Sequence, residues 1–353
     1  MDSIENYKNS KKSHRILILS HKFFPFVGGI EVMSMFLANT LAEAKYSVKV
    51  ITWTQENHEG VLPFEVIRNP SLARIINEFK WADLVIENNP VLRASWPLLF
   101  LKKPLVTVLH TWICRLDNEL AWQDKLKLLW LKRANKVIAV SNALRIKSFK
   151  KADVIMNPYR AEDFKVLKDV EKSMDFVFLG RLVSDKGADM AIKALHELSR
   201  LGYKLNLTII GDGEEKDNLL KLTSQFQLNE FVNFTGTLKG TELVRVLNQH
   251  RYILVPSVWE EPFGLVALEG MACGCIPIVS DGGGLPEAIG EAGVIFKRGD
   301  LNDMVENIVE LLYSTVLQKK LKNAANNHLK NHHSNLIGEK YIESINNVLN
   351  NSY

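Results

Sequence analysis

Short runs of β-branched and aliphatic residues alternate with longer amphipathic stretches along most of this chain, and this alternation constrains its fold most strongly. Short apolar runs are typical of buried strands, whereas apolar residues spaced three or four apart are typical of helices. Strands that alternate with helices predict parallel sheets covered by helices. In the first half, strands are expected at Arg15–Ser20, Ser47–Thr52, Phe64–Arg68, Ala82–Glu87, Leu105–His110, Lys136–Ser141 and Val154–Met156.

The alternation is interrupted once near the middle of the chain and then resumes. Asn157-Pro158-Tyr159 breaks the pattern, and the charged stretch Glu162 to Lys172 is expected to be a linker. We therefore predict two Rossmann-like domains, residues 1–165 and 166–335, and a final helix over 336–353. In the second half, strands are expected at Asp175–Leu179, Leu205–Ile210, Val232–Thr235, Arg251–Ser257, Ile276–Ser280 and Val294–Phe296, with helices from Leu301 onward.

The composition suits two domains of ordinary size. With 353 residues, of which 46% are hydrophobic and 24% charged, the chain is long enough to bury two sizeable cores. No apolar run reaches the roughly 18 residues that cross a bilayer, and the polar start Met1 to Ser13 precedes a run too short for a signal peptide. We expect a cytoplasmic protein. Cys114, Cys273 and Cys275 indicate no disulfide framework, and the last two are expected to be small packing residues.

The net charge of +4 conceals a difference between the two halves. Residues 1–165 contain 25 Lys and Arg against 16 Asp and Glu, a net charge of +9. Subtraction from the totals of 44 and 40 leaves 19 against 24 for residues 166–353, a net charge of −5. A basic first half favours an anionic partner such as a membrane surface or a lipid phosphate. The basic stretches interleaved with aromatic residues that mark an RNA-binding module are absent, so no nucleic-acid partner is expected.

Two glutamates, Glu261 and Glu269, lie eight positions apart in the run Pro256–Gly274. Arg251–Ser257 has the character of a buried strand, and the apolar residues after Gly264 recur at helical spacing. Glu261 is therefore expected in the turn between strand and helix, and Glu269 near the end of the second helical turn. Open parallel sheets bind their ligands at this edge. Paired carboxylates there suit the hydroxyl groups of a sugar or a ribose.

This run resembles the E-x7-E motif of the retaining glycosyltransferases of family GT4, which have the GT-B fold. Gly270 stands where the family usually has alanine. Further matches occur in the family's order and span nearly the whole chain. They are Gly28-Gly29, His110, Gly180-Arg181, Lys186-Gly187, Gly211-Asp212-Gly213, Gly282-Gly283 and Pro286-Glu287. The resemblance implies two Rossmann-like domains that face each other across a cleft, with the C-terminal helix crossing back to the N-terminal domain. It also implies that the first domain binds the acceptor and the second the donor.

The resemblance assigns a role to each glutamate. Glu269 is similar to the family residue that holds the ribose hydroxyls of the nucleotide, and Glu261 to the one that faces the donor sugar. Backbone N–H groups of Phe263, Gly264 and Leu265 would then contact the sugar or phosphate. The alternative for either glutamate is an ordinary N-cap or a surface charge.

Arg181 and Lys186 lie between a predicted strand and the helix expected from Ala188. Two cations at the carboxyl end of a strand, beside helical N–H groups, can hold a diphosphate. The resemblance implies that they neutralise the leaving nucleoside diphosphate. A solvated Arg and Lys in a loop is the alternative. Arg181 is the stronger candidate because its guanidinium can bridge both phosphates.

The remaining candidates rest more heavily on the family context. Gly28-Gly29 precedes a helix expected near Ile30, so unhindered backbone would approach the diphosphate. His110 ends a strand, where a neutral imidazole could hydrogen-bond the donor sugar or the acceptor, although a capping or core histidine fits equally well. Gly211 and Gly213 would border the base or ribose, or form an ordinary tight turn.

The chain also departs from the family at the domain junction. Asn157-Pro158-Tyr159-Arg160 stands at the domain junction where the family usually has Asn-Gly-Val-Asp. No Asp-x-Asp motif occurs, and no His-rich set has ligand spacing, so neither a metal nor another cofactor is expected. The donor substrate would be a UDP-, GDP- or ADP-sugar.

These observations predict a retaining glycosyltransferase that moves a sugar from a nucleoside diphosphate to a sugar, lipid-linked or small-molecule acceptor. Glu261, His110, Arg181 and Lys186 are the candidate catalytic residues. A nucleotide-sugar 2-epimerase of the same fold and a catalytically silent nucleotide-sugar-binding protein are the alternatives. An NAD-dependent dehydrogenase is disfavoured because no G-x-G-x-x-G opens either domain's first helix.

A basic stretch in the first half, Trp122–Lys136, is expected to be helical and has apolar residues that look exposed. Such a helix either lies on an anionic membrane or simply covers the sheet. With the charge of the first half, it predicts a cytoplasmic protein that associates peripherally with the inner face of the membrane.

Overall fold

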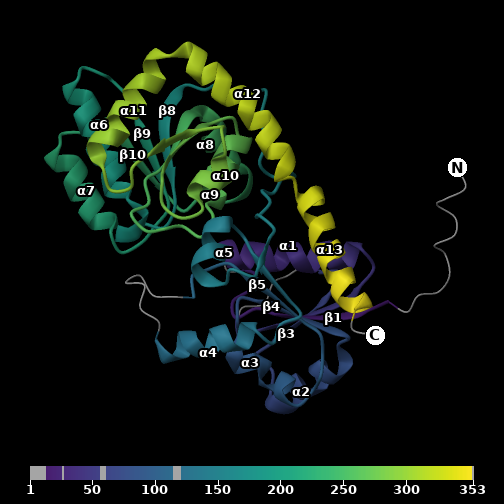
Figure 1. Ribbon diagram of the computed structural model, residues 1–353. Helices are drawn as coiled ribbons and strands as arrows, with labels where there is room; N and C mark the ends of the chain where they lie inside the picture. The colour runs from purple at the N-terminus through teal and green to yellow at the C-terminus, as the bar shows by residue number, and fades with distance from the viewer. Residues whose placement is uncertain (1–12, 26–27, 56–60, 114–120, 352–353) are drawn as a thin grey trace, which may run out of the picture. The chain divides into compact units, whose positions relative to one another are not determined.

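The computed structural model describes residues 13–25, 28–55, 61–113 and 121–351, and Figure 1 shows its elements. The chain forms two compact units, which we describe separately. The first unit comprises Met1–Ala139, Lys147–Ile155 and Gly338–Tyr353, and the second comprises Val140–Ile146 and Met156–Ile337. Of the residues discussed above, Met1–Lys12 and Cys114 lie outside the described residues.

A seven-stranded sheet forms the centre of the first unit, with the order β3-β2-β1-β4-β5-β6-β7. Every strand pairing described in it is parallel, which requires that each connection cross over the sheet. The central strands β1, β4 and β5 are largely apolar and almost entirely buried, as expected for parallel strands whose two faces are both covered. The strands are β1 (Arg15–Leu19), β2 (Ser47–Thr52), β3 (Glu65–Arg68), β4 (Leu84–Asn88), β5 (Leu105–Leu109), β6 (Lys136–Ala139) and β7 (Asp153–Val154).

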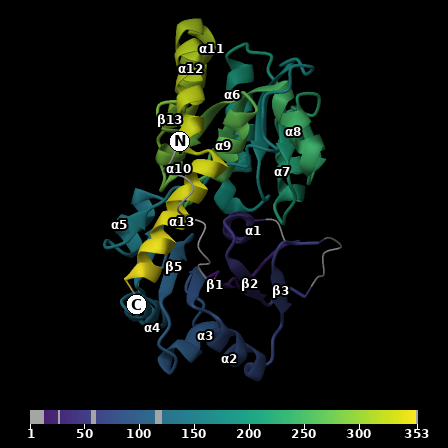
Figure 2. The same ribbon diagram turned by 90° about the vertical axis from the view of Figure 1, so that its right-hand side faces the viewer.

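Helices cover both faces of this sheet (Figures 1 and 2). On one face, α2, α3 and α4 contribute Phe79, Ala94 and Trp130 to a core that also contains strand residues of β1 and β4. On the other face α1 packs against α13, whose Tyr341 ring meets Phe36 edge-on at 6.4 Å. The helices of the first unit are α1 (Gly29–Glu43), α2 (Leu72–Trp81), α3 (Leu92–Ser95), the 3-10 helix η2 (Trp96–Leu99) and α4 (Trp122–Leu131). Two helices are divided between the units: α5 (Asn142–Ser148) lies mostly in the second, and α13 (Ser334–Asn350) lies mostly in the first.

The second unit contains a six-stranded parallel sheet with the order β10-β9-β8-β11-β12-β13. The chain starts in the middle at β8, moves outward to β10 and returns to β11 on the other side of β8. The carboxyl ends of β8 and β11 therefore lie side by side at the point where the strand order reverses. The strands are β8 (Met174–Leu179), β9 (Leu207–Ile210), β10 (Val232–Gly236), β11 (His250–Val255), β12 (Ile276–Ser280) and β13 (Val294–Phe296).

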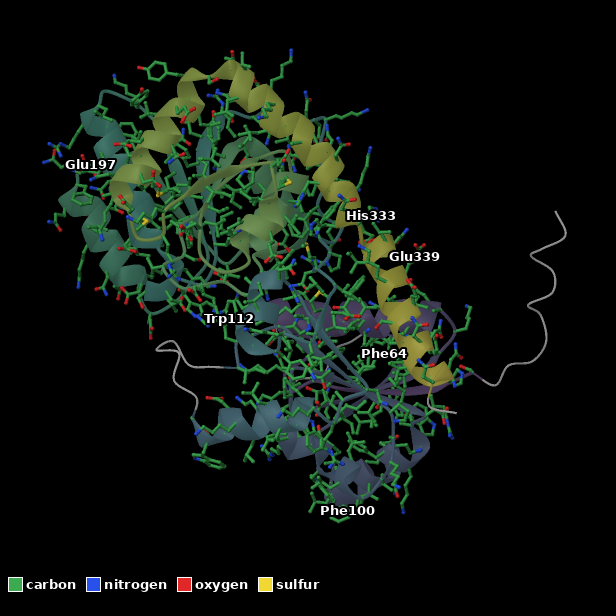
Figure 3. All side chains as sticks on the ribbon, in the orientation of Figure 1. Phe64, Phe100, Trp112, Glu197, His333 and Glu339 are labelled. Atoms are coloured by element: carbon green, nitrogen blue, oxygen red, sulfur yellow. The ribbon has the colours of Figure 1, made fainter. Side chains whose placement is uncertain are left out.

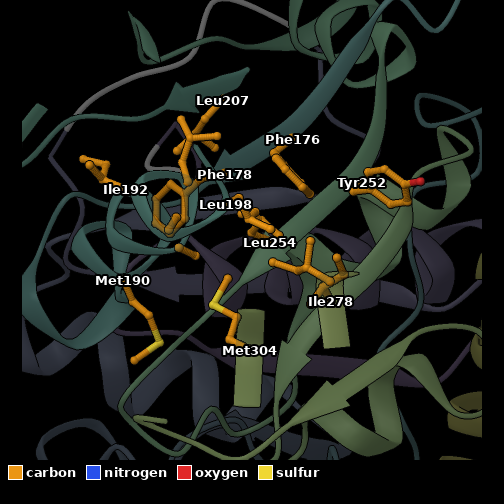
Figure 4. Close-up of a cluster of buried hydrophobic side chains, with 14 of the residues drawn as sticks. Phe176, Phe178, Met190, Ile192, Leu198, Leu207, Tyr252, Leu254, Ile278 and Met304 are labelled. Atoms are coloured by element: carbon orange, nitrogen blue, oxygen red, sulfur yellow. The ribbon is translucent and has the colours of Figure 1, made fainter. Parts of the chain in front are cut away.

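Two apolar cores lie on opposite faces of this second sheet. The first is formed by β-strand residues with α6, α7 and α11, and includes Phe176, Phe178 and Met304 (Figure 4). The second is formed with α8, α9 and α10, and contains Cys273 and Cys275 as buried packing residues. The helices are η3 (Ser184–Lys186), α6 (Ala188–Arg200), α7 (Lys216–Gln225), α8 (Gly240–Gln249), α9 (Leu265–Ala272), α10 (Leu285–Ile289), α11 (Leu301–Tyr313) and α12 (Thr315–Asn331).

The predicted fold class is confirmed, since each unit is a parallel sheet covered by helices. The last helix also packs where it was expected, because residues from Gly338 onward belong to the first unit and Tyr46 donates a hydrogen bond to Asn346 (2.5 Å). The predicted strands are present, although β7 is only two residues long and begins one residue before the predicted range. Within the described residues, no helix is both long and apolar enough to span a membrane.

Candidate active site

Glu261 lies at the carboxyl edge of the second unit's sheet, in the loop between β11 and α9. Its Oε1 atom accepts hydrogen bonds from Lys186 Nζ at 2.5 Å and from Ser257 Oγ at 2.8 Å. Ser257 is itself held from the neighbouring strand, because Ser280 Oγ donates to its carbonyl oxygen at 2.7 Å. The structure therefore brings together two of the predicted site residues, Glu261 and Lys186, and adds Ser257, which the sequence analysis did not single out.

Lys186 reaches Glu261 because the loops after β8 and β11 are joined through their backbones. The N–H groups of Val258 and Trp259 donate to the carbonyl oxygen of Asp185, at 3.0 and 3.3 Å. Gly187 takes a left-handed conformation, with φ of 72°, and a Cβ atom there would lie 2.1 Å from the carbonyl oxygen of Pro256. A residue other than glycine would thus be strained and would also push the two loops apart.

Lys186 also lies over an aromatic ring, since its Nζ atom is 5.4 Å from the centre of the Trp259 ring. The lysine and Glu261 side chains are only 18% and 14% exposed, so water screens their charges weakly. Arg181, which follows β8 in the same loop, is exposed and forms no ion pair with the described residues. One predicted cation is therefore held in place, and the other remains available to a ligand.

The start of α9 is shaped by a glycine in an unusual conformation. Gly264 is the N-cap residue with φ of 122°, and a Cβ atom there would lie 2.5 Å from the Leu285 side chain. No side chain caps this helix, so its first N–H groups are not satisfied in the usual way. Phe263 is buried, with its ring 5.7 Å from that of His332. Phe263, Gly264 and Leu265 thus place backbone, rather than a capping side chain, at this edge.

Glu269 lies on α9, and its described ion pair is with Arg160 rather than with Lys186. Burial raises the pKa of its carboxyl group to about 7, and Arg160 opposes this rise. Arg160 Nη2 is 3.9 Å from Glu269 Oε1, and the Glu269 side chain is 14% exposed. The carboxyl group is therefore near its titration midpoint at neutral pH, next to a cation that sequence reasoning noted only as a departure from the family pattern.

Gly211 and Gly213 have a structural role. The N–H group of Gly211 donates to the carbonyl of Gly236, and its φ is 143°. A Cβ atom at Gly211 would lie 1.8 Å from the carbonyl oxygen of Gly180, and one at Gly213 would lie 2.3 Å from that of Leu182. Both glycines are therefore required for the loops after β8 and β9 to pack against each other. Their predicted contact with the base or ribose stays a prediction.

His110 follows β5 in the first unit and is buried. Its Nε2 atom shares a hydrogen bond with Asn88 Oδ1 at 2.5 Å, and its backbone N–H donates to Asn89 Oδ1 at 2.7 Å. Burial lowers the pKa of His110 to about 3, so the ring is neutral at physiological pH. The Nδ1 atom has no hydrogen-bond partner among the described residues. A buried polar atom of this kind is costly, and a ligand hydroxyl would satisfy it.

Asn88 connects His110 to the start of α1, where Gly28 and Gly29 lie. Its Nδ2 atom donates to Ser34 Oγ at 2.5 Å and to the carbonyl oxygen of Ile30 at 3.2 Å. Gly29 is the first residue of α1, and no side chain caps the helix at Gly28. The predicted first-unit residues are thus linked through Asn88 and Ser34. The pair Asn88-Asn89 at the end of β4 is the only signal of these residues in the sequence, and by itself it assigns no role to either.

One further carboxylate of the second unit is fully engaged. Glu287 accepts hydrogen bonds from the backbone N–H groups of Asn142 at 2.7 Å and Ala143 at 2.8 Å, at the start of α5. Ser141 Oγ donates to the carbonyl of Pro262 at 2.6 Å. The segment Val140–Ile146 is therefore fastened to the Glu261 loop. Sequence reasoning had matched Glu287 to a family motif without giving it a role.

No group of three or more His, Cys, Asp or Glu residues is arranged to hold a metal ion within the described ranges.

Two Rossmann-like parallel sheets, one of which carries Lys186, Glu261 and the uncapped start of α9 at its carboxyl edge, form the arrangement of the GT-B class. Residues 159–350 match the model of the family described as Glycosyl transferases group 1, and residues 27–148 match that of Glycosyltransferase Family 4. The chain belongs to the glycosyl transferases group 1 family, and it is a glycosyltransferase.

Similar proteins agree with this assignment. The gpi3 subunit of phosphatidylinositol N-acetylglucosaminyltransferase from Schizosaccharomyces pombe is 26% identical over 341 residues, which cover 86% of this chain and 74% of that protein. Glycogen synthase from Mycobacterium tuberculosis is 33% identical over 157 residues, covering 44% of this chain and 38% of that protein.

Among solved structures, HepE from Anabaena in complex with UDP and glucose has a TM-score of 0.79 at 19% identity, covering 95% of this chain and 100% of that one. Sucrose-phosphate synthase from Thermosynechococcus elongatus has a TM-score of 0.78, also at 19% identity, covering 95% of this chain and 99% of that one. At this identity the structural likeness establishes the fold.

Proposed function

We propose that this glycosyltransferase takes its sugar from a nucleoside diphosphate donor held by the second unit. The observation that carries the proposal is the Lys186–Glu261 pair, which sets a cation and a hydroxyl acceptor side by side where β8 and β11 end. Arg181 is exposed in the same loop and supplies a second cation for the diphosphate. Glu269 is assigned to the ribose hydroxyls. The presence of UDP in the HepE structures agrees with a donor of this class.

Catalysis is proposed to rest on charge stabilisation. As the sugar–phosphate bond breaks, negative charge grows on the diphosphate, and Arg181 and Lys186 stabilise that charge most in the transition state. Glu261 Oε1 already accepts from Lys186 and Ser257, which favours a binding role over attack on the sugar. Without a protein nucleophile, the acceptor hydroxyl attacks the face that the diphosphate leaves, and the anomeric configuration is retained.

In the first unit, His110 is proposed to bind a hydroxyl group of the sugar or of the acceptor. Its ring is neutral and its Nδ1 atom is buried without a partner in the described chain, so it can make one further hydrogen bond. The reaction is further proposed to need no metal ion, because the two cations can take over the neutralisation of the diphosphate that a divalent ion would otherwise provide.

The decisive experiment compares binding and turnover. A calorimetric panel of UDP, GDP, ADP and their sugars identifies the donor, and incubation with and without acceptors then follows the sugar. Arg181→Ala should weaken diphosphate binding about 10-fold or more, as expected for one charge-assisted contact, without loss of folding. A nucleotide-sugar product formed without acceptor would indicate an epimerase, and binding without any turnover would indicate a silent binding protein. Absence of nucleotide binding would refute the proposal.

A surface of the first unit supports an acceptor at a membrane. On α4, Trp122, Leu126 and Leu129 are exposed and recur at spacings of four and three residues, so they form one apolar stripe. Lys125 and Lys132 flank the stripe and are exposed as well. We call these five residues the α4 surface. An apolar stripe flanked by cations is the arrangement with which helices bind anionic bilayers.

Two further exposed apolar residues lie at the end of η2, which is bonded to the end of α4. Arg133 Nη2 donates to the carbonyl of Leu98 at 3.2 Å, which joins the end of α4 to η2. Leu99 and Phe100 follow, and Phe100 is 79% exposed at the edge of this unit (Figure 3). Lys127 does not belong to this surface, because it pairs with Asp124 at 3.1 Å.

The net charge of residues 1–165 is +9, and a positive charge favours binding to anionic lipid. We therefore propose peripheral membrane binding and a lipid-linked acceptor.

Liposome binding tests this surface. The protein should sediment with vesicles that contain anionic lipid at low salt and be released at high salt, because the Debye length shortens. Lys125→Glu with Lys132→Glu should abolish binding, while the matched control Lys204→Glu with Lys221→Glu, on exposed lysines of the second unit, should reduce it little. Equal binding to neutral and anionic vesicles, or none, would contradict the proposal and favour a soluble acceptor.

A further inference from the structure

Arg160 lies in the segment Asn157–Arg160 and beside a carboxylate of the proposed nucleotide site. Arg160 Nη2 is 3.9 Å from Glu269 Oε1. The guanidinium is oriented by two further contacts, an ion pair with Asp163 at 3.2 Å and the face of the Phe164 ring, 5.0 Å from its centre.

We propose that Arg160 is a positioning residue of the nucleotide site, which acts through Glu269 by holding its carboxylate in the form that accepts hydrogen bonds from the ribose hydroxyls. The inference rests on the proposed function. A ribose offers hydroxyl donors, and an ionised carboxylate offers only acceptors, whereas a protonated one uses an oxygen as a donor. Because Glu269 is largely buried, the neutral form is favoured unless a cation lies close.

No other described cation approaches Glu269 as Arg160 does. Asp163, next to Arg160, favours the neutral form of Glu269. The thiol of Cys273, the C-cap residue of α9, is neutral, because burial raises its pKa to about 12. Among the titratable groups on the elements packed against α9, His250, Arg251 and Tyr252 on β11, Glu287 on α10, and His328 and His332 at the end of α12 contact other partners. The α12 lysines, Lys319, Lys320, Lys322 and Lys330, are exposed to solvent, which screens their charges.

The expected effect depends on pH, which separates positioning from direct contact. Loss of the half-exposed Arg160 charge should raise the Glu269 pKa by about one unit, from about 7. The ionised fraction at pH 7 would then fall from about one half to about one tenth, and nucleotide affinity should fall about fivefold, with little change at pH 9.

Calorimetric titration with the nucleoside diphosphate that binds the wild type, repeated from pH 6.5 to 9, tests this inference. Arg160→Ala should move the acid limb of the affinity profile upward by about one pH unit, and Arg160→Lys should restore it. In Glu269→Gln, which cannot ionise, adding Arg160→Ala should change nothing further. Arg245→Ala is the matched control, because Arg245 forms an exposed ion pair with Asp169 elsewhere in the same unit.

Two results would overturn the inference. An equal loss of affinity at every pH would make Arg160 a direct nucleotide contact, and an unchanged profile would make it irrelevant to the site. Both differ from the failure of the proposed function, in which the wild-type protein binds no nucleoside diphosphate at any pH.

Discussion

Removal of the Lys186 ammonium group is expected to lower both the stability of the second unit and its affinity for a nucleoside diphosphate. Lys186 Nζ is 2.5 Å from Glu261 Oε1, and both side chains are largely buried. Lys186→Ala leaves the carboxylate with Ser257 Oγ as its remaining described donor. The variant therefore keeps a charge in a poorly solvated place without the cation that balanced it.

The magnitude follows from the burial of the pair. A hydrogen bond to a charged group contributes about 1.5–3 kcal/mol, whereas a fully exposed ion pair contributes about 0.2–1 kcal/mol. With side chains 18% and 14% exposed, the pair is close to the buried case, so Lys186→Ala should lower the free energy of unfolding by about 2 kcal/mol. Glu261→Gln should cost less, because an amide oxygen still accepts from Lys186 and Ser257. The double variant should reveal a coupling of about 1–2 kcal/mol.

Urea denaturation and calorimetry measure the two effects. Nucleoside diphosphate affinity of Lys186→Ala should fall about 10-fold or more, which corresponds to about 1.4 kcal/mol. The control is Lys193→Ala on α6, which removes a lysine paired with Asp189 at 2.7 Å where both side chains are 44% exposed, and should cost less than about 0.5 kcal/mol. If Lys186→Ala matched this control in both assays, the reasoning from burial and the diphosphate assignment would both be refuted.

Four further outcomes are expected. Activity should survive excess EDTA, and strict dependence on added magnesium or manganese would count against the diphosphate site. Lys172 Nζ donates to three backbone carbonyl oxygens, at the ends of α8, β11 and α9. Lys172→Met should therefore lower the free energy of unfolding by about 2–3 kcal/mol. A change under about 0.5 kcal/mol in urea denaturation would contradict this expectation. Burial lowers the pKa of His250 to about 4, whereas the pKa in the unfolded chain is near 6.5. The unfolded chain therefore takes up the proton first, and about 3 kcal/mol of the free energy of unfolding is lost as pH falls from 6.5 to 4. In His250→Gln, the free energy of unfolding should depend less steeply on pH over this range. Gly211→Ala should lower the melting temperature by several degrees, because its Cβ atom would lie 1.8 Å from a backbone oxygen; an unchanged melting temperature would mean that the loop relaxes freely.

The strands and their ends were predictable because each buried strand is a short apolar run between polar turns. Glu261 was therefore placed correctly in the turn before α9, and Lys186 just before α6. Their contact was not predictable in atomic terms, because the residues are 75 positions apart and meet only when β8 and β11 become neighbours. The same holds for Arg160 and Glu269, whose proximity depends on how the junction segment packs beside α9.

Asn88 and Ser257 illustrate a second limit. Neither belongs to a motif, and single polar residues after strands are common, so only the hydrogen bonds to His110 and Glu261 reveal what they do. Gly211 illustrates the reverse case. Because it lies beside a proposed binding loop, the sequence favoured a contact with a ligand. In the structure, its backbone lies so close to the Gly180 carbonyl that no side chain would fit, and this packing already accounts for a glycine here.

The division of the chain has a consequence for protein synthesis. The first unit includes Gly338–Tyr353, and Tyr341, Ile345 and Leu349 of α13 are almost fully buried. A ribosome must therefore translate the whole of the second unit before the first can complete its core, although the first begins at the N-terminus. The nascent first unit carries an uncovered apolar face throughout that interval. A chimera that exchanges the second unit for that of a relative must accordingly keep α13 with its own α1, because both belong to one folding unit.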